Sequence, residues 1–399
     1  MYSAVKISNN VYWVGAVDWN IRDFHGYQTK RGTTYNAYLI VSEKAALIDT
    51  VRAPFKDEMM SRIRSVIDPK EIEIIVSNHA EMDHTGCLPD LIRELKPEAV
   101  YASPMGAKVL QELFTLPQEV IPVKDEDSIS LGNMNLTCME TRMVHWPDSM
   151  FSYLEDDKLL FSQDGFGMHY ASSERFDGDI PESILEYEAS TYFANILLPF
   201  APMVAKLIKR ITSSGLEIRI VAPDHGPVWK RNPQGIIQKY IDWSEQKPSD
   251  KAVIVYGSMW QNTEKMARSI AEGLAFRGIH VKTMCMDVHH RSEVMYELLD
   301  SAAVVIGSST LNNNMLPQMA DILTYMKGLK PKNLMGFAFG SYGWSGEGAV
   351  HVDAQMKEMG IELTGEPLRA KNAPTEAIFR ECYERGDALG EKIQNLLDR

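Results

Sequence analysis

The sequence has little cysteine and no closely spaced cysteine pair. Its 399 residues contain four cysteines, Cys87, Cys138, Cys285 and Cys382, far apart in the chain. A disulfide framework is therefore not expected, and a reducing compartment suits the protein. No Cys-x-x-Cys pair is present, which excludes an iron–sulfur or zinc ribbon module built on such pairs. A redox protein with this sequence would need an external electron donor.

Long apolar runs and an excess of positive charge are also missing. No stretch approaches about 18 consecutive apolar residues, and residues 1–13 lack a basic segment followed by an apolar one. We therefore expect no membrane segment and a cytoplasmic location. The formal net charge of −13 disfavours nucleic acids and anionic membranes as partners, because both repel a like-charged surface. Small molecules and other proteins remain.

The length and the changing pattern of the chain indicate two domains. The first half mixes expected strands and helices without a regular alternation, and the polar break Lys247–Asp250 follows an expected helix at 234–246. We place the domain boundary there, giving domains 1–248 and 249–399. Expected strands of the first domain cover 10–17, 33–41, 45–51 and 72–76, with a helix at 54–67.

The second half alternates strands and helices, which predicts a doubly wound parallel sheet like that of flavodoxin. The expected strands cover 252–256, 281–286, 302–306 and 334–339, and the expected helices 264–277 and 318–326. Polar loops follow three of these strands at their carboxyl ends, where such sheets bind ligands. The whole chain thus combines α+β and α/β architecture.

A cluster of potential metal ligands follows the expected strand at 72–76. His79, Glu81, Asp83 and His84 fall within six positions, and Gly86 permits a turn. Alternate residues can point to one side of a loop, whereas His84 directly follows Asp83 and neighbouring side chains ordinarily diverge. A single histidine is more often structural than metal-binding. Two histidines and two acids packed behind an apolar strand favour a metal site.

Three further candidates each follow a β-like run: His145, Asp164 and His225. Together the seven residues supply four imidazoles and three carboxylates, enough to hold two cations in a low-dielectric pocket. His25 and His169 are candidates for proton donation or hydrogen bonding near this pocket, with a surface or capping role as the alternative. His280, His289, His290 and His351 are expected to be solvated.

The first half resembles the metallo-β-lactamase superfamily, whose zinc hydrolases carry His-x-His-x-Asp-His in the corresponding loop. Here Glu81 replaces the second histidine, and a carboxylate suits iron better than zinc. A carboxylate at this position is typical of flavodiiron proteins, also called A-type flavoproteins, and the chain resembles that family. The resemblance extends to the segments 32–39, 145–150 and 223–226. It implies an αββα sandwich, two non-haem irons held by the seven residues, and Asp164 as the bridging ligand.

Three loops of the second half suggest an FMN site. Their hydroxyl, amide and backbone N–H groups suit a phosphate, and their aromatic side chains and glycines suit an isoalloxazine ring. Helix capping and core packing are the ordinary alternatives. The candidate FMN residues are Ser258, Met259, Trp260, Gln261, Asn262, Thr263, Ser309, Thr310, Asn312, Asn313, Ser341, Tyr342, Gly343, Trp344, Ser345 and Gly346.

The resemblance implies an oxidoreductase in which FMN passes electrons to a di-iron centre that reduces dioxygen to water or nitric oxide to nitrous oxide. It implies rubredoxin, or a reduced deazaflavin, as the electron donor. It also implies a head-to-tail homodimer or dimer of dimers, which brings one chain's FMN to the other chain's iron site. The rival hypotheses are a di-zinc hydrolase with an accessory flavodoxin domain, a non-enzymatic FMN electron carrier and an interaction scaffold. The sequence leaves the choice between dioxygen and nitric oxide open.

Overall fold

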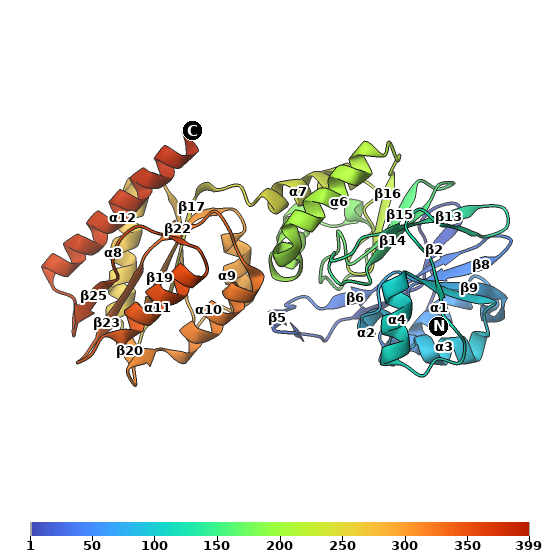
Figure 1. Ribbon diagram of the computed structural model, residues 1–399, viewed down its shortest axis with the longest axis horizontal. Helices are drawn as coiled ribbons and strands as arrows, with labels where there is room; N and C mark the ends of the chain where they lie inside the picture. Colours follow the sequence, from blue (N-terminus) through green and yellow to red (C-terminus); the bar gives the residue numbers. More distant parts are fainter. Residues whose placement is uncertain (1, 399) are drawn as a thin grey trace. The chain divides into compact units, whose positions relative to one another are not determined.

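The computed structural model describes residues 2–398 and divides the chain into two compact units. The N-terminal unit comprises the chain up to Phe193 together with Phe200–Ser244. The C-terminal unit comprises the chain from Glu245 onward together with the short segment Ala194–Pro199. Both units mix helices and sheets (Figure 1).

The N-terminal unit is built on two stacked sheets. The seven-stranded sheet has, in spatial order, β1 (Val5–Lys6), β2 (Val11–Trp13), β7 (Tyr38–Ile40), β8 (Ala45–Ile48), β9 (Ile72–Ser77), β10 (Ala99–Ala102) and β11 (Ile121–Pro122). The five-stranded sheet has β12 (Ser128–Ser130), β13 (Asn135–Glu140), β14 (Met150–Leu154), β15 (Leu159–Gln163) and β16 (Ile220–Pro223). Two small ribbons pair β3 (Ala16–Asp18) with β6 (Thr33–Tyr35), and β4 (Asp23–Phe24) with β5 (Tyr27–Gln28).

Alternation along the strands creates the layers of this unit. Tyr38 and Ile40 face the five-stranded sheet and share a buried core with Phe161. The intervening Leu39 faces the opposite way and packs with the helices outside the sheet. Because successive side chains of a strand point to opposite faces, a strand buried on both faces is apolar throughout.

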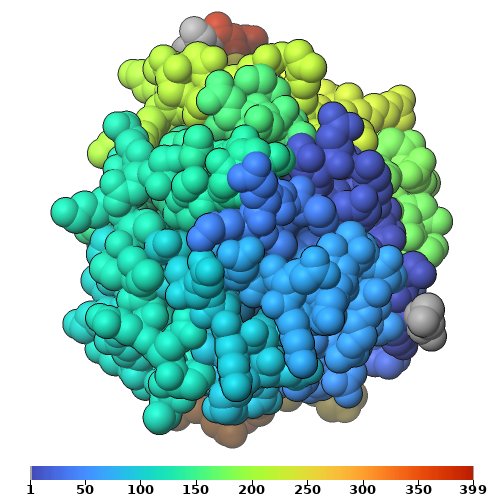
Figure 2. Space-filling model, turned by 90° about the vertical axis from the view of Figure 1, so that its right-hand side faces the viewer, coloured from blue at the N-terminus to red at the C-terminus, as the bar shows by residue number. Residues whose placement is uncertain are grey.

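Helices cover the outer faces of both sheets, which completes an αββα sandwich (Figure 1). Those over the seven-stranded sheet are α1 (Lys56–Ile63), α3 (Leu88–Leu95) and α4 (Pro104–Leu113), and the one-turn helix α2 (Met82–Thr85) precedes α3. Those beside the five-stranded sheet are α5 (Glu182–Tyr192), α6 (Ala201–Ser213) and α7 (Pro233–Glu245). Figure 2 views this unit from the side on which the blue-to-cyan segments of the chain gather.

Two of the expected strands are interrupted in the structure. The expected strand 10–17 is split into β2 and β3, and the expected strand 33–41 into β6 and β7. Gly15 lies at the first break, where an added Cβ would stand 2.2 Å from the carbonyl oxygen of Tyr35. The chain around Gly15 and the chain around Tyr35 are therefore both interrupted where their backbones lie close together. A continuous apolar pattern in the sequence does not reveal such a contact.

The C-terminal unit has a parallel sheet, as expected for a doubly wound fold. Its strands are β18 (His280–Cys285), β17 (Ser249–Gly257), β19 (Ser301–Ser308), β22 (Met335–Gly336) and β24 (Glu362–Leu363) in spatial order, with β23 (Ala338–Tyr342) pairing β19 and β25 (Leu368–Lys371). The short β20 (Thr310–Leu311) pairs β21 (Asn314–Met315). The expected break Lys247–Asp250 is partly wrong, because β17 already begins at Ser249. The expected strand 334–339 is likewise divided into β22 and β23.

Helices cover both faces of this sheet, with α8 (Asn262–Phe276) and α12 (Glu376–Leu397) packed on one of them (Figure 1). This unit also contains α9 (Arg291–Leu298), α10 (Pro317–Leu329) and α11 (Glu347–Glu358). Glycines bring α8 and α12 together: an added Cβ on Gly273 would lie 2.1 Å from the carbonyl oxygen of Tyr383.

One helical run, Glu182–Ser213, is long and apolar enough by composition to cross a membrane. However, 61% of its most apolar window is buried inside the protein. Core helices of soluble proteins pass the same test, so the run is weak evidence for a membrane segment.

Candidate metal and flavin sites

The metal-ligand candidates gather at one edge of the sandwich, beyond the carboxyl ends of strands. His79 and Glu81 follow β9, and Asp83 with the adjacent histidine lies in α2. His145 lies in the loop between β13 and β14, while Asp164 follows β15 and His225 follows β16. The edges of both sheets thus contribute to one buried site.

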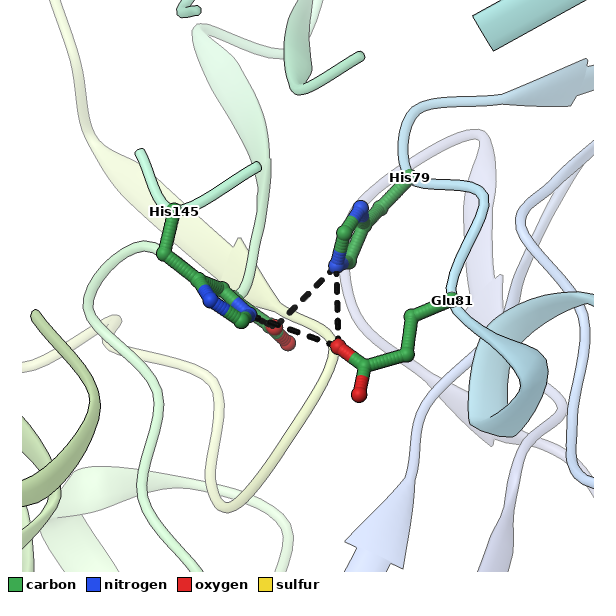
Figure 3. Close-up of side chains that lie close together, drawn as sticks. His79, Glu81 and His145 are labelled. Atoms are coloured by element: carbon green, nitrogen blue, oxygen red, sulfur yellow. Dashed lines mark hydrogen bonds and ion pairs between the residues drawn. The ribbon is translucent and has the colours of Figure 1, made fainter. Parts of the chain in front are cut away.

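One group of ligand atoms comes from His79, Glu81, His145 and Asp164. Their potential ligand atoms all lie within 4.8 Å of one another. The Glu81 Oε2 atom is 3.3 Å from His79 Nε2 and 3.4 Å from His145 Nε2. Figure 3 shows His79 and Glu81, both from the loop after β9, converging with His145 from a second loop. Two imidazoles and two carboxylates around one point suit a transition metal ion.

A second group comes from Asp83, His84 and His225, whose ligand atoms also lie within 4.8 Å of one another. His225 Nε2 is 3.1 Å from Asp83 Oδ2, and His84 Nε2 is 3.3 Å from Asp83 Oδ1. Consecutive residues converge here because they lie in a helical turn, where neighbouring side chains are separated by about 100° and not by the 180° of a strand. The expected divergence of His84 from Asp83 is therefore wrong.

Asp164 lies between the two groups and presents a different oxygen to each. Its Oδ2 is 2.8 Å from His145 Nε2 and 3.5 Å from His79 Nε2. Its Oδ1 is 3.2 Å from His84 Nε2 and 3.4 Å from His225 Nε2. A carboxylate with one oxygen in each group is the arrangement that a bridging ligand requires.

Further polar groups orient the histidine rings from behind. His79 Nδ1 donates to Asp148 Oδ2 at 3.0 Å, and His225 Nδ1 to the carbonyl oxygen of Thr34 at 2.6 Å. His84 Nδ1 lies 3.4 Å from Asp224 Oδ2. Such partners determine which ring nitrogen faces the metal. Asp148 and Asp224 were not predicted from the sequence, although each lies within three residues of a predicted ligand.

The charges of the cluster depend on one another. Burial by itself lowers the pKa of His79, but its contacts with Asp148 and Glu81 raise it well above its usual value. Burial likewise opposes protonation of His84, while Asp83 and Asp164 raise its pKa to about 9. Burial favours the neutral acid at Asp164, yet the surrounding histidines hold its pKa well below normal. Without a metal, protons therefore supply the positive charge that these carboxylates require.

Several buried polar atoms of the cluster fit metal ligation. Among residues 2–398, both carboxylate oxygens of Asp83, both ring nitrogens of His84 and Oδ1 of Asp164 have no hydrogen-bond partner. Buried polar atoms without partners are costly, and metal coordination satisfies them. The donor set of nitrogen and oxygen without sulfur suits iron.

Gly86 acts differently from the expected turn residue. Its φ is −58°, an ordinary helical value, at the end of α2. An added Cβ would stand 2.6 Å from the Met82 carbonyl oxygen and 2.9 Å from Ala53 N. The glycine therefore permits a close approach between two backbones.

The remaining histidines divide by environment. His25 has a side chain 75% exposed, with Nε2 3.4 Å from Glu81 Oε1. His169 is buried, with Nδ1 2.8 Å from Thr33 Oγ1, and its ring centroid lies 4.7 Å from that of His225. The expectation that His290 is solvated is wrong, because its side chain caps the N-terminus of α9.

A cavity of about 410 Å³ lies at the carboxyl edge of the parallel sheet in the C-terminal unit. Ten of the candidate FMN residues line it: Met259, Trp260, Asn262, Ser309, Thr310, Asn312, Ser341, Tyr342, Gly343 and Trp344. Trp260 and Trp344 are 82% and 83% exposed. The three predicted loops therefore meet around one hollow that combines hydroxyl groups with aromatic rings.

The other six candidates, Ser258, Gln261, Thr263, Asn313, Ser345 and Gly346, do not line the cavity and shape its loops. Thr263 is fully buried, and its Oγ1 lies 3.0 Å from Ser309 Oγ and 2.9 Å from Ser341 Oγ. It thereby joins all three loops. Gln261 and Gly346 adopt positive φ at the starts of α8 and α11.

Leu311, Asn372 and Ala373 also line the cavity and were missed by the sequence analysis. Asn372 and Ala373 follow β25, a fourth parallel strand that ends at the same edge. The alternating segment 368–371 followed by Asn-Ala-Pro was the available signal.

The fold and these sites define a class: a binuclear metalloprotein on a lactamase-like sandwich, joined to a flavodoxin-like unit. Residues 33–226 match the family described as ODP family beta lactamase, and residues 254–386 match flavodoxin. The chain is 45% identical over 395 residues to the rubredoxin-oxygen oxidoreductase of Megalodesulfovibrio gigas, covering 98% of each chain. It is 42% identical over 398 residues to the nitric oxide reductase of Moorella thermoacetica, covering 98% of this chain and 100% of the relative.

A solved structure gives the same result. The flavodiiron protein from Giardia intestinalis superimposes with a TM-score of 0.95 at 32% sequence identity, covering 99% of this chain and 98% of that chain. The chain therefore belongs to the flavodiiron protein family. This confirms the expected fold class, a lactamase-like sandwich followed by a flavodoxin-like unit.

Proposed function

We propose that this protein is a flavodiiron oxidoreductase that uses FMN and a non-haem di-iron centre to reduce dioxygen to water or nitric oxide to nitrous oxide. The observation that carries the proposal is Asp164, which presents one oxygen to each of two groups of buried ligand atoms. The names of the rubredoxin-oxygen oxidoreductase and nitric oxide reductase relatives support the two substrates.

Each iron would have its own set of ligands. His79, Glu81 and His145 would hold one iron, and Asp83, His84 and His225 the other, with Asp164 between them. When bound, the two irons supply a site that binds and reduces the small gas molecule. The protein orients His79 through its hydrogen bond to Asp148, and Asp224 lies 3.4 Å from His84 Nδ1. The burial of the ligand side chains limits access of bulk water.

His25 occupies a separate position at the edge of the site. Its exposed ring reaches solvent on one side and lies 3.4 Å from Glu81 on the other. This position allows it to exchange protons between solvent and the carboxylate. Among residues 2–398, His169 has no hydrogen-bond partner at Nε2. Its burial, and to a smaller extent repulsion from the neighbouring His225, hold its pKa well below the usual value. It therefore remains a neutral ring that packs against the His225 ligand.

FMN would bind in the cavity of the C-terminal unit, where it supplies electron transfer in steps of one or two electrons. Backbone N–H groups at the start of α8 would hold its phosphate, because a helix N-terminus attracts anions. The exposed Trp260 and Trp344 offer flat surfaces for the ring system. Thr263 fixes the loops that surround it.

The proposal also covers the domain boundary, the electron donor, the cellular location and the oligomeric state. We assign residues 1–248 to the di-iron domain and 249–399 to the FMN domain. Rubredoxin, or another small electron donor, would reduce the FMN of a cytoplasmic protein. A head-to-tail homodimer, alone or as a dimer of dimers, would bring the FMN of one chain to the iron site of its partner.

The test is anaerobic reduction of the purified protein, followed by rapid mixing with dioxygen and, separately, with nitric oxide. We expect about two irons and one FMN per chain, and flavin reoxidation faster than that of free FMN with at least one gas. The Glu81→Ala variant should keep FMN and lose this reaction. Two zinc ions, no iron and hydrolysis of a thioester or lactam would instead establish the rival di-zinc hydrolase.

A further inference from the structure

A second cavity in the N-terminal unit, with a volume of about 390 Å³, is separate from the metal and FMN sites. Its lining includes Tyr2, Trp13, Trp19, Glu58, Arg62 and Arg175. None of these residues belongs to the predicted ligand sets. The volume falls within the range of about 300–1,000 Å³ that is typical of sites for small organic ligands.

Arg175 is a buried cation without an anionic partner. Only 7% of the residue is exposed, and its guanidinium lies 4.5 Å from the Trp13 ring centroid, with no carboxylate within 4.0 Å among residues 2–398. Glu174 and Glu58 act on it only from a greater distance. Burial is the main cause that lowers the pKa of Arg175 to about 10, and repulsion from Arg62 is the second. The side chain therefore remains charged at neutral pH. An unpaired buried charge is costly. This cost would be relieved by an anion in the cavity.

The other charges of the cavity limit what that anion can be. Arg62 is paired with Glu58 at 2.7 Å, and its Nη1 donates to the Ser3 carbonyl oxygen at 2.6 Å. Its Nε atom is buried and has no hydrogen-bond partner among residues 2–398. Among the lining residues, two guanidinium groups and one carboxylate leave a single positive charge, and the carboxylate of Glu174 acts on Arg175 from outside the lining. This balance favours a monoanion over a multiply charged phosphate ester.

Aromatic rings supply the apolar part of the cavity. The Trp13 ring is held by its Nε1 hydrogen bond to Asn36 Oδ1 at 2.8 Å. The guanidinium carbons of Arg62 and Arg175 lie 4.6 Å and 4.5 Å from its ring centroid. Tyr2 and Trp19 are 50% and 54% exposed. The buried indole supports the two guanidinium groups. The two accessible rings provide flat apolar surface beside a guanidinium fork that matches a carboxylate.

We infer that this cavity is a binding site for a small organic carboxylate carrying one negative charge and a planar apolar group. Arg175 would bind the carboxylate, Trp19 and Tyr2 would contact the apolar group, and the buried Trp13 would hold the Arg175 guanidinium in place. The inference does not depend on the redox function, because its residues and those of the metal and FMN sites are different.

The probe for this site is 4-iodobenzoate, titrated calorimetrically into the full-length protein loaded with iron and FMN. One molecule should bind per chain, and anomalous scattering from a soaked crystal should place the iodine in the cavity. The Arg175→Met variant should bind at least about tenfold more weakly, the loss expected for a charge-assisted hydrogen-bonded pair. Arg64→Met is the matched control, because the Arg64 side chain is 56% exposed and pairs with Glu94 outside the cavity.

Three outcomes would overturn the inference. They are absence of binding at about 10 mM probe, a weak limit for a specific site, equal binding by Arg175→Met, and inorganic phosphate binding at least as tightly as the probe. If Arg175→Met does not fold, Arg175→Lys serves in its place, since lysine keeps the charge and lacks the planar fork. The position of the iodine in the wild-type crystal decides the question independently of any variant.

Discussion

At the scale of single residues, the metal site depends on carboxylates that face more than one partner. Asp164 contacts histidines of both ligand groups, and Asp148 holds His79 from behind while accepting a hydrogen bond from the Ala80 backbone. The first residue would touch the metals, and the second would orient a ligand. Their substitutions should therefore have different consequences.

Asp164→Ala should reduce bound iron from about two per chain to well below one, because it removes a ligand from both groups. Asp148→Ala should retain the ligands but weaken metal affinity by about 10–100-fold, since a ring that is not oriented binds less well. Metal analysis after dialysis against a series of chelator concentrations distinguishes the two. Asp179→Ala, at an exposed position, is the control; equal iron contents in all three variants would contradict the assignment.

Metal loading should release protons. In the metal-free protein the pKa of His79 lies well above its usual value and that of His84 is about 9. Both rings are therefore positively charged at pH 7, with a proton on each ring nitrogen. A metal binds neutral imidazole, and each ligated ring must lose one of these protons. Affinity should consequently rise as the pH increases toward about 9.

The measurement is the acidification of a weakly buffered anaerobic solution when ferrous ion is added to the metal-free protein at pH 7. His25→Ala, which removes a histidine outside the predicted ligand set, should leave the number of released protons nearly unchanged. Metal binding without proton release would show that the cluster is already neutral.

At the scale of secondary structure elements, the C-terminal unit depends on the contact between α8 and α12. Gly273 on α8 approaches Tyr383, and Gly386 on α12 approaches the carbonyl oxygen of Ile270, with an added Cβ at 2.1 Å and 2.2 Å respectively. A glycine ordinarily weakens a helix. Here the missing side chains permit the helices to pack backbone against backbone.

Gly273→Ala should lower the free energy of unfolding of the C-terminal unit by about 1–3 kcal/mol, because the helices must separate. Gly328→Ala in α10 has open space around its Cβ and should raise it by up to about 1 kcal/mol. Urea unfolding followed by the fluorescence of released FMN measures both. Stabilisation by Gly273→Ala would contradict the close contact.

At the scale of the whole molecule, the proposed dimer can be tested by complementation. Glu81→Ala removes a predicted iron ligand, and Ser341→Trp fills the predicted FMN cavity. Each chain alone should be inactive. In a head-to-tail heterodimer one of the two FMN–iron pairs stays intact, so about half of the wild-type activity should return.

Co-expression with two different affinity tags allows the heterodimer to be purified. Each variant co-expressed with itself under the same two tags is the control. A heterodimer as inactive as both homodimers would mean that electrons pass within one chain.

The sequence alone indicated most of the fold, because strands and helices have different periods and the parallel strands of the second half are strongly apolar. It also indicated the seven ligand candidates, since each follows a β-like run and four of them lie within six positions. Ten of the sixteen FMN candidates line the cavity for the same reason: loops after parallel strands meet at one edge.

The tertiary structure decided what local patterns do not contain. The two faces of Asp164, the convergence of Asp83 and His84, and the meeting of Trp13 with Arg175 depend on the three-dimensional arrangement of the strands, turns and loops. Trp13 and Arg175 are separated by more than 160 positions in the chain, and no sequence period links them. Sequence periodicity reports which face of an element is apolar, whereas only packing determines which side chains from distant elements share a cavity.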